Sequence, residues 1–246
     1  MNRGKPQPDD FTEAVESWWW IWESGPVPGE KTDALKEEGR MKAFADNIRP
    51  NLAGDFPKIH TSALIDPSAQ IIGNVMIAQD VFVGPLTVIR SDQRGVDGKV
   101  ESIIIEEEVN IQDGVIIHSE PGKGVVIGAR TSIAHGVTIH GPCRIGQFCF
   151  LAIRSTVYSA TFEDHVWLGM GATAMRVTLP SFTMVPAGGV LRGYPDALGL
   201  RLVTDEEKEY MEQVLRENSR LRQDYLELRK KAESIRSAAE EKMSKR

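Results

Sequence analysis

An aliphatic residue returns every six positions through the middle of this chain, and this repeat limits the possible folds more than any other feature. The period fits neither the 3.6 residues of an α-helical turn nor a heptad, and β-branched residues dominate the series. Self-similarity at so short a fixed period is typical of β-helices. The repeated positions are Ile59, Ile65, Ile71, Ile77, Val83 and Ile89, then Ile105, Ile111, Ile117, Ile127, Ile133, Ile139, Ile145, Leu151, Val157, Phe162, Leu168, Ala174, Leu179 and Val185.

Three six-residue sides make one triangular coil of 18 residues, so the repeat predicts a mainly β fold whose repeated residue points inward. Glycines such as Gly73, Gly84 and Gly128 suit the tight corners. The repeat resembles that of hexapeptide transferases, which implies a left-handed parallel β-helix. We expect this domain over residues 58–203, an N-terminal extension of helical and irregular structure over 1–57, and a long α-helix over 204–246.

Composition excludes several classes of protein. The formal net charge is −6, so no basic excess favours nucleic acid, and no apolar run is long enough to span a bilayer. The amino terminus lacks the apolar stretch of a signal peptide. Cys143 and Cys149 occupy small inward positions and are too few for a disulfide framework. We therefore expect a cytoplasmic protein.

The C-terminal segment reads as one helix over 205–243, with more than half of its residues charged. A 3-4 spacing predicts a seam along it, with a polar residue, Asn218, at one seam position. Two interpretations stay open: the seam packs on the β-helix, or its distal half forms a coil between subunits. The seam residues are Met211, Val214, Asn218, Leu221, Tyr225, Leu228, Ala232, Ile235 and Ala239.

The N-terminal extension contains a tryptophan cluster in an otherwise acidic stretch, Phe11 to Glu23, with Trp18, Trp19, Trp20 and Trp22. Such a cluster is too short to cross a membrane and needs an apolar surface to cover it. It either packs on the protein itself or docks on a protein partner.

Three of the five histidines lie close together on the repeat. His118 and His140 each follow a repeated isoleucine, and their separation of 22 residues equals one coil plus a four-residue insertion. They should therefore lie side by side on one outer wall, about 4.8 Å apart between strands, where two imidazoles suit one metal ion. His135 falls in a different slot and points from another wall. It could complete a three-histidine site from a neighbouring subunit of a trimer. His60 and His165 lack matched partners and are taken as structural.

Three segments resemble the signature of γ-class carbonic anhydrases. They are Arg90 to Asp92, Asn110 to His118 and Ala134 to Pro142, and the similarity covers about residues 57–190. The segment Arg154 to Tyr158 is similar to the branch that contains the carboxysomal scaffold homologues.

The resemblance implies a residue set. His118 and His140 of one subunit and His135 of the next would hold Zn²⁺, although imidazole suits Fe²⁺ and Co²⁺ as well. Gln112 would hydrogen-bond the water at the metal, and Asn110 would border the substrate pocket. Arg90 and Asp92 would pair at the subunit interface, with Asp113 nearby.

The same resemblance implies a homotrimer that hydrates carbon dioxide reversibly to bicarbonate and a proton, through attack by hydroxide formed at the metal. Gln93 stands where the best-studied family members carry a proton-shuttle glutamate, and it cannot titrate. Glu120 or Tyr158 would replace it. The first alternative is a weak or inactive scaffold of the same family, located in a bacterial microcompartment. The second is a hexapeptide acyltransferase, which has no need of three metal-spaced histidines.

Overall fold

The computed structural model describes residues 46–193 and 199–244. Most of the predicted N-terminal extension, including the tryptophan cluster, lies outside these residues. One strand, β1 (Ile48–Arg49), already pairs with β4 of the β-helix. The β-helix thus begins about ten residues before position 58, where the repeat becomes recognisable in the sequence.

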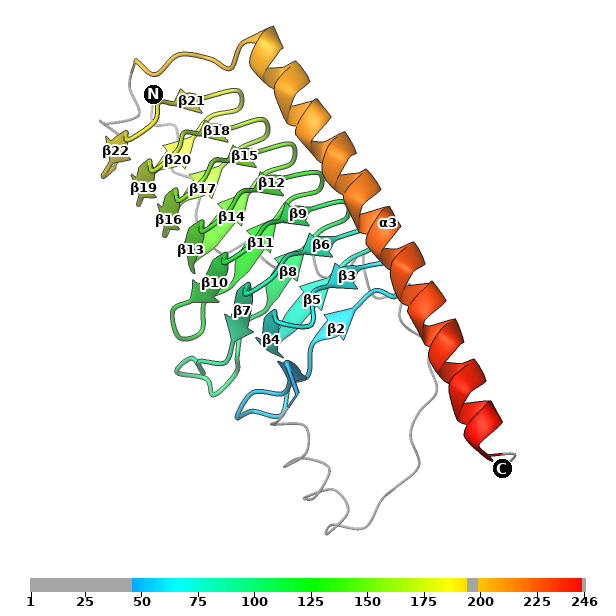
Figure 1. Ribbon diagram of the computed structural model, residues 1–246. Coiled ribbons are helices and arrows are strands. Elements are labelled where there is room, and N and C mark those ends of the chain that lie inside the picture. Colours follow the sequence, from blue (N-terminus) through cyan, green and yellow to red (C-terminus); the bar gives the residue numbers. More distant parts are fainter. Residues whose placement is uncertain (1–45, 194–198, 245–246) are drawn as a thin grey trace. The chain divides into compact units, whose positions relative to one another are not determined.

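Short strands form three parallel sheets that are the three walls of a prism (Figure 1). Sheet A contains β1, β4 (Gln70–Gly73), β7 (Val88–Ser91), β10 (Ile116–Ser119), β13 (Thr138–Gly141), β16 (Thr156–Tyr158), β19 (Thr173–Met175) and β22 (Val190–Leu191). Sheet B contains β2 (Lys58–Ile59), β5 (Val75–Ile77), β8 (Ile103–Ile105), β11 (Val125–Ile127), β14 (Cys143–Ile145), β17 (Thr161–Phe162) and β20 (Thr178–Leu179). Sheet C contains β3 (Leu64–Ile65), β6 (Phe82–Val83), β9 (Asn110–Ile111), β12 (Ser132–Ile133), β15 (Phe150–Leu151), β18 (Trp167–Leu168) and β21 (Met184–Val185).

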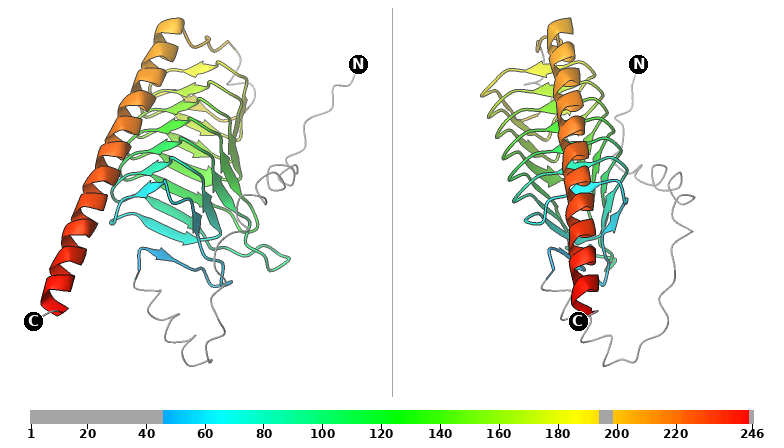
Figure 2. Two further views of the ribbon diagram at one scale, coloured as in Figure 1. Left: turned by 90° about the vertical axis from the view of Figure 1, so that its right-hand side faces the viewer. Right: turned by 45° about the vertical axis from the view of Figure 1, so that its right-hand side comes forward.

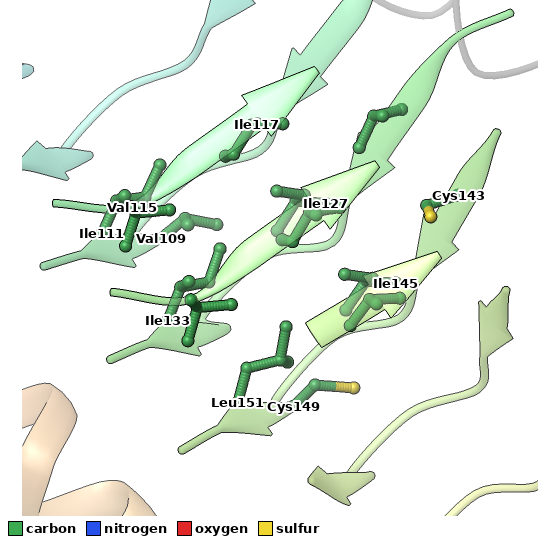
Figure 3. Packing of buried hydrophobic residues seen from close by; sticks show 14 of the residues in the cluster. Val109, Ile111, Val115, Ile117, Ile127, Ile133, Cys143, Ile145, Cys149 and Leu151 are labelled. Atoms are coloured by element: carbon green, nitrogen blue, oxygen red, sulfur yellow. The ribbon is translucent and has the colours of Figure 1, made fainter. Parts of the chain in front are cut away.

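The predicted fold class is confirmed: the chain is a left-handed parallel β-helix with one C-terminal helix. Equivalent repeat positions pair directly, as Ile117 does with Ile89 and Ile139. The repeated aliphatic residues form the core, and most of them are fully buried (Figure 3). Burial at this scale is the main stabilising contribution to such a fold. Both cysteines are buried free thiols, in agreement with their predicted inward positions.

Two loops interrupt the repeat on the same side of the prism, after β7 and after β10 (Figure 1). They touch at Gly95 and Gly122, where a Cβ on Gly95 would lie 2.9 Å from the Cα of Gly122. A side chain at either position would push the loops apart. The break in the repeat after Arg90 and the four-residue insertion after His118 are therefore one structural feature.

Helix α3 (Asp205–Ser244) runs along the outer face of sheet C and continues past the end of the prism at β3 (Figures 1 and 2). Thr204 caps it through its hydroxyl oxygen, which accepts from the Glu207 N–H, while the Glu207 carboxylate accepts from the Thr204 N–H. Met211 packs in a cluster with Phe150, Ala152 and Val203 on the outside of sheet C.

The predicted seam packs on the prism of its own chain over the first half of this helix but does not do so over the second, where the alternative of a coil between subunits stays a prediction. Met211, Val214 and Asn218 face the prism, as predicted. The next buried position is Arg222 rather than Leu221, which is 41% exposed. The remaining large apolar residues of the seam are also exposed, because this part of α3 extends beyond the last coil of the prism. These residues are Tyr225, Leu228 and Ile235. The seam residues of the distal half are therefore not covered by the described coils of the same chain.

Candidate metal centre

His118 and His140 lie side by side on the outer face of sheet A. The predicted register is confirmed: His118 in β10 pairs with His140 in β13, and their ring centroids are 5.3 Å apart. The ladder continues with Arg90 on one side and Tyr158 on the other, whose ring stacks on His140 at 5.4 Å. Each of these residues follows an inward aliphatic residue and therefore points outward.

The surroundings of both imidazoles suit metal ligation. His118 Nε2 is buried and has no hydrogen-bond partner among the described residues. Burial lowers the pKa of His118, and the adjacent Arg90 cation lowers it further, so the neutral ligand form is favoured. His140 Nδ1 lies 3.2 Å from the Gly141 carbonyl oxygen, which leaves Nε2 to face outward as a lone-pair donor. The pair therefore fits a divalent transition-metal ion.

Arg90 and Asp92 flank the imidazoles from β7 and the loop after it. Arg90 Nη1 donates to Asp92 Oδ2 at 3.0 Å within the same chain. The other carboxylate oxygen, Oδ1, lies 3.4 Å from His118 Nε2, and both of these atoms are buried without a hydrogen-bond partner. Asp92 Oδ1 and His118 Nε2 thus lie next to each other without hydrogen-bond partners, and a cation is the expected ligand at this position.

His135 lies at the corner where the chain leaves sheet C. Its side chain is half-exposed, with Nδ1 3.5 Å from Asp113 Oδ2. Gly114 and Gly136 follow these two residues with φ of +67° and +68°, a left-handed conformation that favours glycine and produces the tight corner. Asp113 and His135 thus lie next to each other, and the Gln-Asp-Gly and Ala-His-Gly sequences are two stacked copies of the same turn.

Gln112 lies between these corners and helix α3. Its Nε2 donates to Asn110 Oδ1 at 2.7 Å and to Asn218 Oδ1 at 3.0 Å. Asn110 Nδ2 donates in turn to Ser132 Oγ. Both amide hydrogens of Gln112 are therefore engaged, and these two bonds fix the orientation of Oε1, an acceptor that suits an O–H group.

Asn218 was not predicted as a site residue, although a polar residue within an apolar seam was a signal. Its Nδ2 donates to the Val214 carbonyl oxygen, which fixes the amide so that Oδ1 accepts from Gln112. The rotation of α3 about its axis decides this contact, and the spacing of the seam alone does not specify it.

Glu120 and Tyr158, predicted as alternative proton-transfer groups, are in direct contact. Tyr158 Oη donates to Glu120 Oε1 at 2.7 Å. This hydrogen bond raises the pKa of the Tyr158 phenol, with Glu120 as the dominant cause. Gln93 is exposed, and its backbone carbonyl oxygen accepts from the Gly122 N–H in the second loop at 3.4 Å.

The residues therefore form two half-sites on different parts of one chain. One half-site, on sheet A, contains Arg90, Asp92, His118, His140, Glu120 and Tyr158. The other, at the corner after sheet C, contains Asn110, Gln112, Asp113, His135 and Asn218. Within the described part of one chain, no group of three or more His, Cys, Asp or Glu side chains could hold a metal ion. No described helix is both long and apolar enough to cross a membrane.

The fold and the histidine pair define a hexapeptide-repeat β-helix protein with a candidate metal centre. The structure superposes with a TM-score of 0.60 on a hexapeptide transferase family protein from Anaplasma phagocytophilum, at 26% identity over 72% of this chain and 96% of that one. No family model matches the chain.

Two sequence relatives identify the family to which the chain belongs among hexapeptide-repeat β-helix proteins. The chain is 31% identical to a carbonic anhydrase from Methanosarcina thermophila over 208 residues, covering 74% of this chain and 81% of that protein. It is also 33% identical to the carboxysome assembly protein CcmM of Nostoc over 179 residues, 69% of this chain, but spans only 31% of that protein's length. The chain therefore belongs to the γ-class carbonic anhydrase family.

Proposed function

We propose that this protein is a metal-dependent carbonic anhydrase that hydrates carbon dioxide reversibly to bicarbonate and a proton. The observation that carries this proposal is the pair of adjacent imidazoles on sheet A, one of which has a buried Nε2 without a hydrogen-bond partner. The Methanosarcina relative supports it, since that protein is a carbonic anhydrase. Zn²⁺, Fe²⁺ or Co²⁺ would suit the nitrogen ligands equally.

The active form is a homotrimer whose sites each combine two chains. His118 and His140 of one subunit and His135 of the next would hold the ion, because these three side chains do not meet within one described chain. An ion held there supplies a Lewis acid that brings the pKa of a water molecule to about 7. Gln112, whose amide is oriented by Asn110 and Asn218, would present Oε1 as a hydrogen-bond acceptor toward this position.

Proton removal falls to Glu120 and Tyr158. Gln93 cannot accept a proton, whereas the Glu120 carboxylate lies on the loop next to the histidine wall and holds the Tyr158 hydroxyl. Tyr158 also stacks on His140, so it brings the carboxylate close to the reacting water. Glu120 would be the acceptor and Tyr158 its positioning partner.

A second candidate function is assembly, with weak or no catalysis. It is favoured by Gln93 at the proton-shuttle position and by the similarity to carboxysome assembly proteins. On this reading the protein would reside in a bacterial microcompartment. On either reading we expect it in the cytoplasm, where its two free thiols remain reduced.

Metal analysis combined with a carbon dioxide hydration assay tests these proposals. We expect one metal ion per chain and a measurable hydration rate that added imidazole raises in the wild type, and loss of both metal and hydration in His140→Ala. His60→Ala is the matched control, because the His60 ring bonds to Ser62 near the start of the prism, away from the histidine pair, and this variant should keep both. Bound metal without hydration would favour assembly, and absence of metal would contradict the assigned site. Turnover of an acetyl-coenzyme A substrate would instead favour an acyltransferase.

A further inference from the structure

Helix α3 exposes two large apolar residues on the flank next to the candidate metal centre. Leu221 and Tyr225 follow Asn218 by three and seven residues, so all three lie on one side of the helix. From that side Asn218 contacts Gln112, at the corner where the chain leaves sheet C. Leu221 is 41% exposed and Tyr225 is 49% exposed, so the described residues of the same chain do not cover this pair, which we call the α3 strip.

The same corner stays apolar in the two coils that follow His135. Its turns stack directly, because the Arg154 N–H donates to the His135 carbonyl oxygen and the Gly171 N–H donates to that of Ile153. Ile153 and Met170 therefore occupy the position of His135 in successive coils, and both are exposed. Apolar residues exposed along one edge in this way are typical of a surface that another molecule covers.

The trimer of the proposed function brings this corner onto sheet A of a neighbouring subunit. His135 lies between β10 and β13 along the chain, so its level along the prism falls between those of His118 and His140. A three-fold axis parallel to the prism therefore joins the three histidines without sliding one chain along another. Each contact then pairs two different surfaces, the corner of one chain and sheet A of the next.

The same symmetry decides which edge of sheet A meets helix α3. Each sheet A carries the corner of a second chain, while its own corner edge rests on the third chain beside the axis. The opposite edge of sheet A therefore points away from the axis, toward sheet C and α3 of the second chain. Within one chain this edge and α3 lie on opposite sides of the prism (Figures 1 and 2), so a contact between them requires a neighbour.

The loops after β1 and β7 leave sheet A at that edge and expose apolar residues. Leu52 is 83% exposed in the first loop, and Val96 is fully exposed in the second. Arg94 Nη2 donates to the Leu52 carbonyl oxygen at 2.9 Å, which holds the two loops together. Leu52 belongs to the first coil of the prism, and Arg222 of α3 donates to the Ser62 carbonyl oxygen in that same coil. The loops and the α3 strip therefore lie at the same level along the prism.

We propose that the α3 strip of each subunit docks on Leu52 and Val96 of the next subunit in the homotrimer. This interface rests on the trimer of the proposed function and adds to it a contact that involves none of the metal ligands. The loop after β7 begins at Asp92 of the sheet A half-site, and Asn218 beside the strip contacts Gln112 of the corner half-site. The docked helix thus holds the two half-sites of one centre against each other.

Sedimentation of the full chain over a concentration series tests the docking through assembly rather than activity. Leu221→Gln and Tyr225→Gln replace an apolar side chain by a good helix former, and each should raise the dissociation constant of the trimer about tenfold or more. Leu228→Gln, at an exposed leucine about one turn further along α3, is the matched control and should change it less than about twofold. Circular dichroism checks that all three variants keep the fold.

Crosslinking identifies the surface that covers the strip. In full chains that carry both Leu52→Cys and Tyr225→Cys, a short bismaleimide should join the subunits into covalent trimers. Leu52→Cys combined with Arg220→Cys is the control pair and should not crosslink, because Arg220 lines the groove on the opposite flank of α3. The native Cys143 and Cys149 are buried and do not compete for the reagent.

The outcomes separate this interface from the proposed function. A trimer that neither strip variant weakens, or that the first cysteine pair fails to crosslink, would overturn the docking whether or not the protein hydrates carbon dioxide. An equal loss in Leu228→Gln would assign the strip to a coil between helices and would also overturn it. A wild-type chain that stays monomeric would instead contradict the shared metal site itself.

Discussion

Sheets A and C are walls of the same coils, yet their outer faces are completed in different ways. The outer column of sheet C is covered by the chain's own helix, and it is apolar at Phe82, Phe150 and Trp167. The outer column of sheet A instead carries imidazoles and an arginine, and α3, the helix of the described residues, packs on sheet C rather than over this column. The outer face of sheet C is thus covered within the chain, whereas on the proposed function the outer face of sheet A would need a second chain to complete its site.

The outer column of sheet C, the wall covered by α3, also contains two polar residues in its middle, Asn110 and Ser132, which we call the polar step. Asn110 and Ser132 interrupt the apolar column at the two coils nearest the histidines, and α3 places Asn218 opposite this step. Buried polar groups of this kind are stable only when each has a partner, and here the chain of hydrogen bonds ends on Gln112. The helix is therefore part of the candidate site as well as a cover for the sheet.

The largest expected effect comes from mixing two inactive variants. His135→Ala damages only the corner half-site and His140→Ala only the sheet A half-site, so each homotrimer should be inactive. Random co-assembly after unfolding and refolding should restore about a quarter of the wild-type hydration rate, because each site draws its two halves from different chains. Mixed trimers without activity would show that the two walls do not meet across a subunit interface.

The second prediction compares the two halves of α3. Met211→Ala removes a side chain that is 6% exposed against sheet C and should lower the free energy of unfolding by about 2 kcal/mol or more. Leu228→Ala, at a position that is 60% exposed beyond the prism, should change it by less than about 0.5 kcal/mol. Denaturant unfolding of both variants measures the difference. A large loss in Leu228→Ala would indicate that the distal half packs between subunits.

The third prediction isolates the polar step on the covered wall. Asn218→Ala removes one of the two acceptors that fix Gln112, so Gln112 can rotate away from the reacting water. The expected loss is about tenfold in kcat/KM with metal content unchanged, as is common for groups that orient a site from behind. Ser219→Ala, next to it on the same helix, serves as the control. Loss of metal together with activity would instead mean that Asn218 only supports the fold.

The repeat made the inward positions and strand pairing of the prism predictable, because a fixed six-residue period decides which side chains point inward and which strands pair, but it did not reveal β1, which lies before the repeat becomes recognisable. The same lattice placed His118 beside His140 and separated His135 from them. The contact between Asn218 and Gln112 could not be derived in this way. It depends on how α3 is rotated against sheet C, which the packing of Met211 and Val214 determines, and the 3-4 spacing continues past the point where the prism ends.

The smallest expected effect concerns proton transfer at the outer face of sheet A. Gln93→Glu places a titratable group on the loop beside Gly122 and should raise the hydration rate severalfold in dilute buffer. Tyr158→Phe should lower it severalfold by releasing the Glu120 carboxylate. Added imidazole should reduce both differences, because a diffusing base replaces the missing acceptor. Stopped-flow assays across buffer concentrations provide the measurement. A wild-type rate that is fast and independent of buffer would exclude slow proton removal and would show that Gln93 leaves catalysis intact.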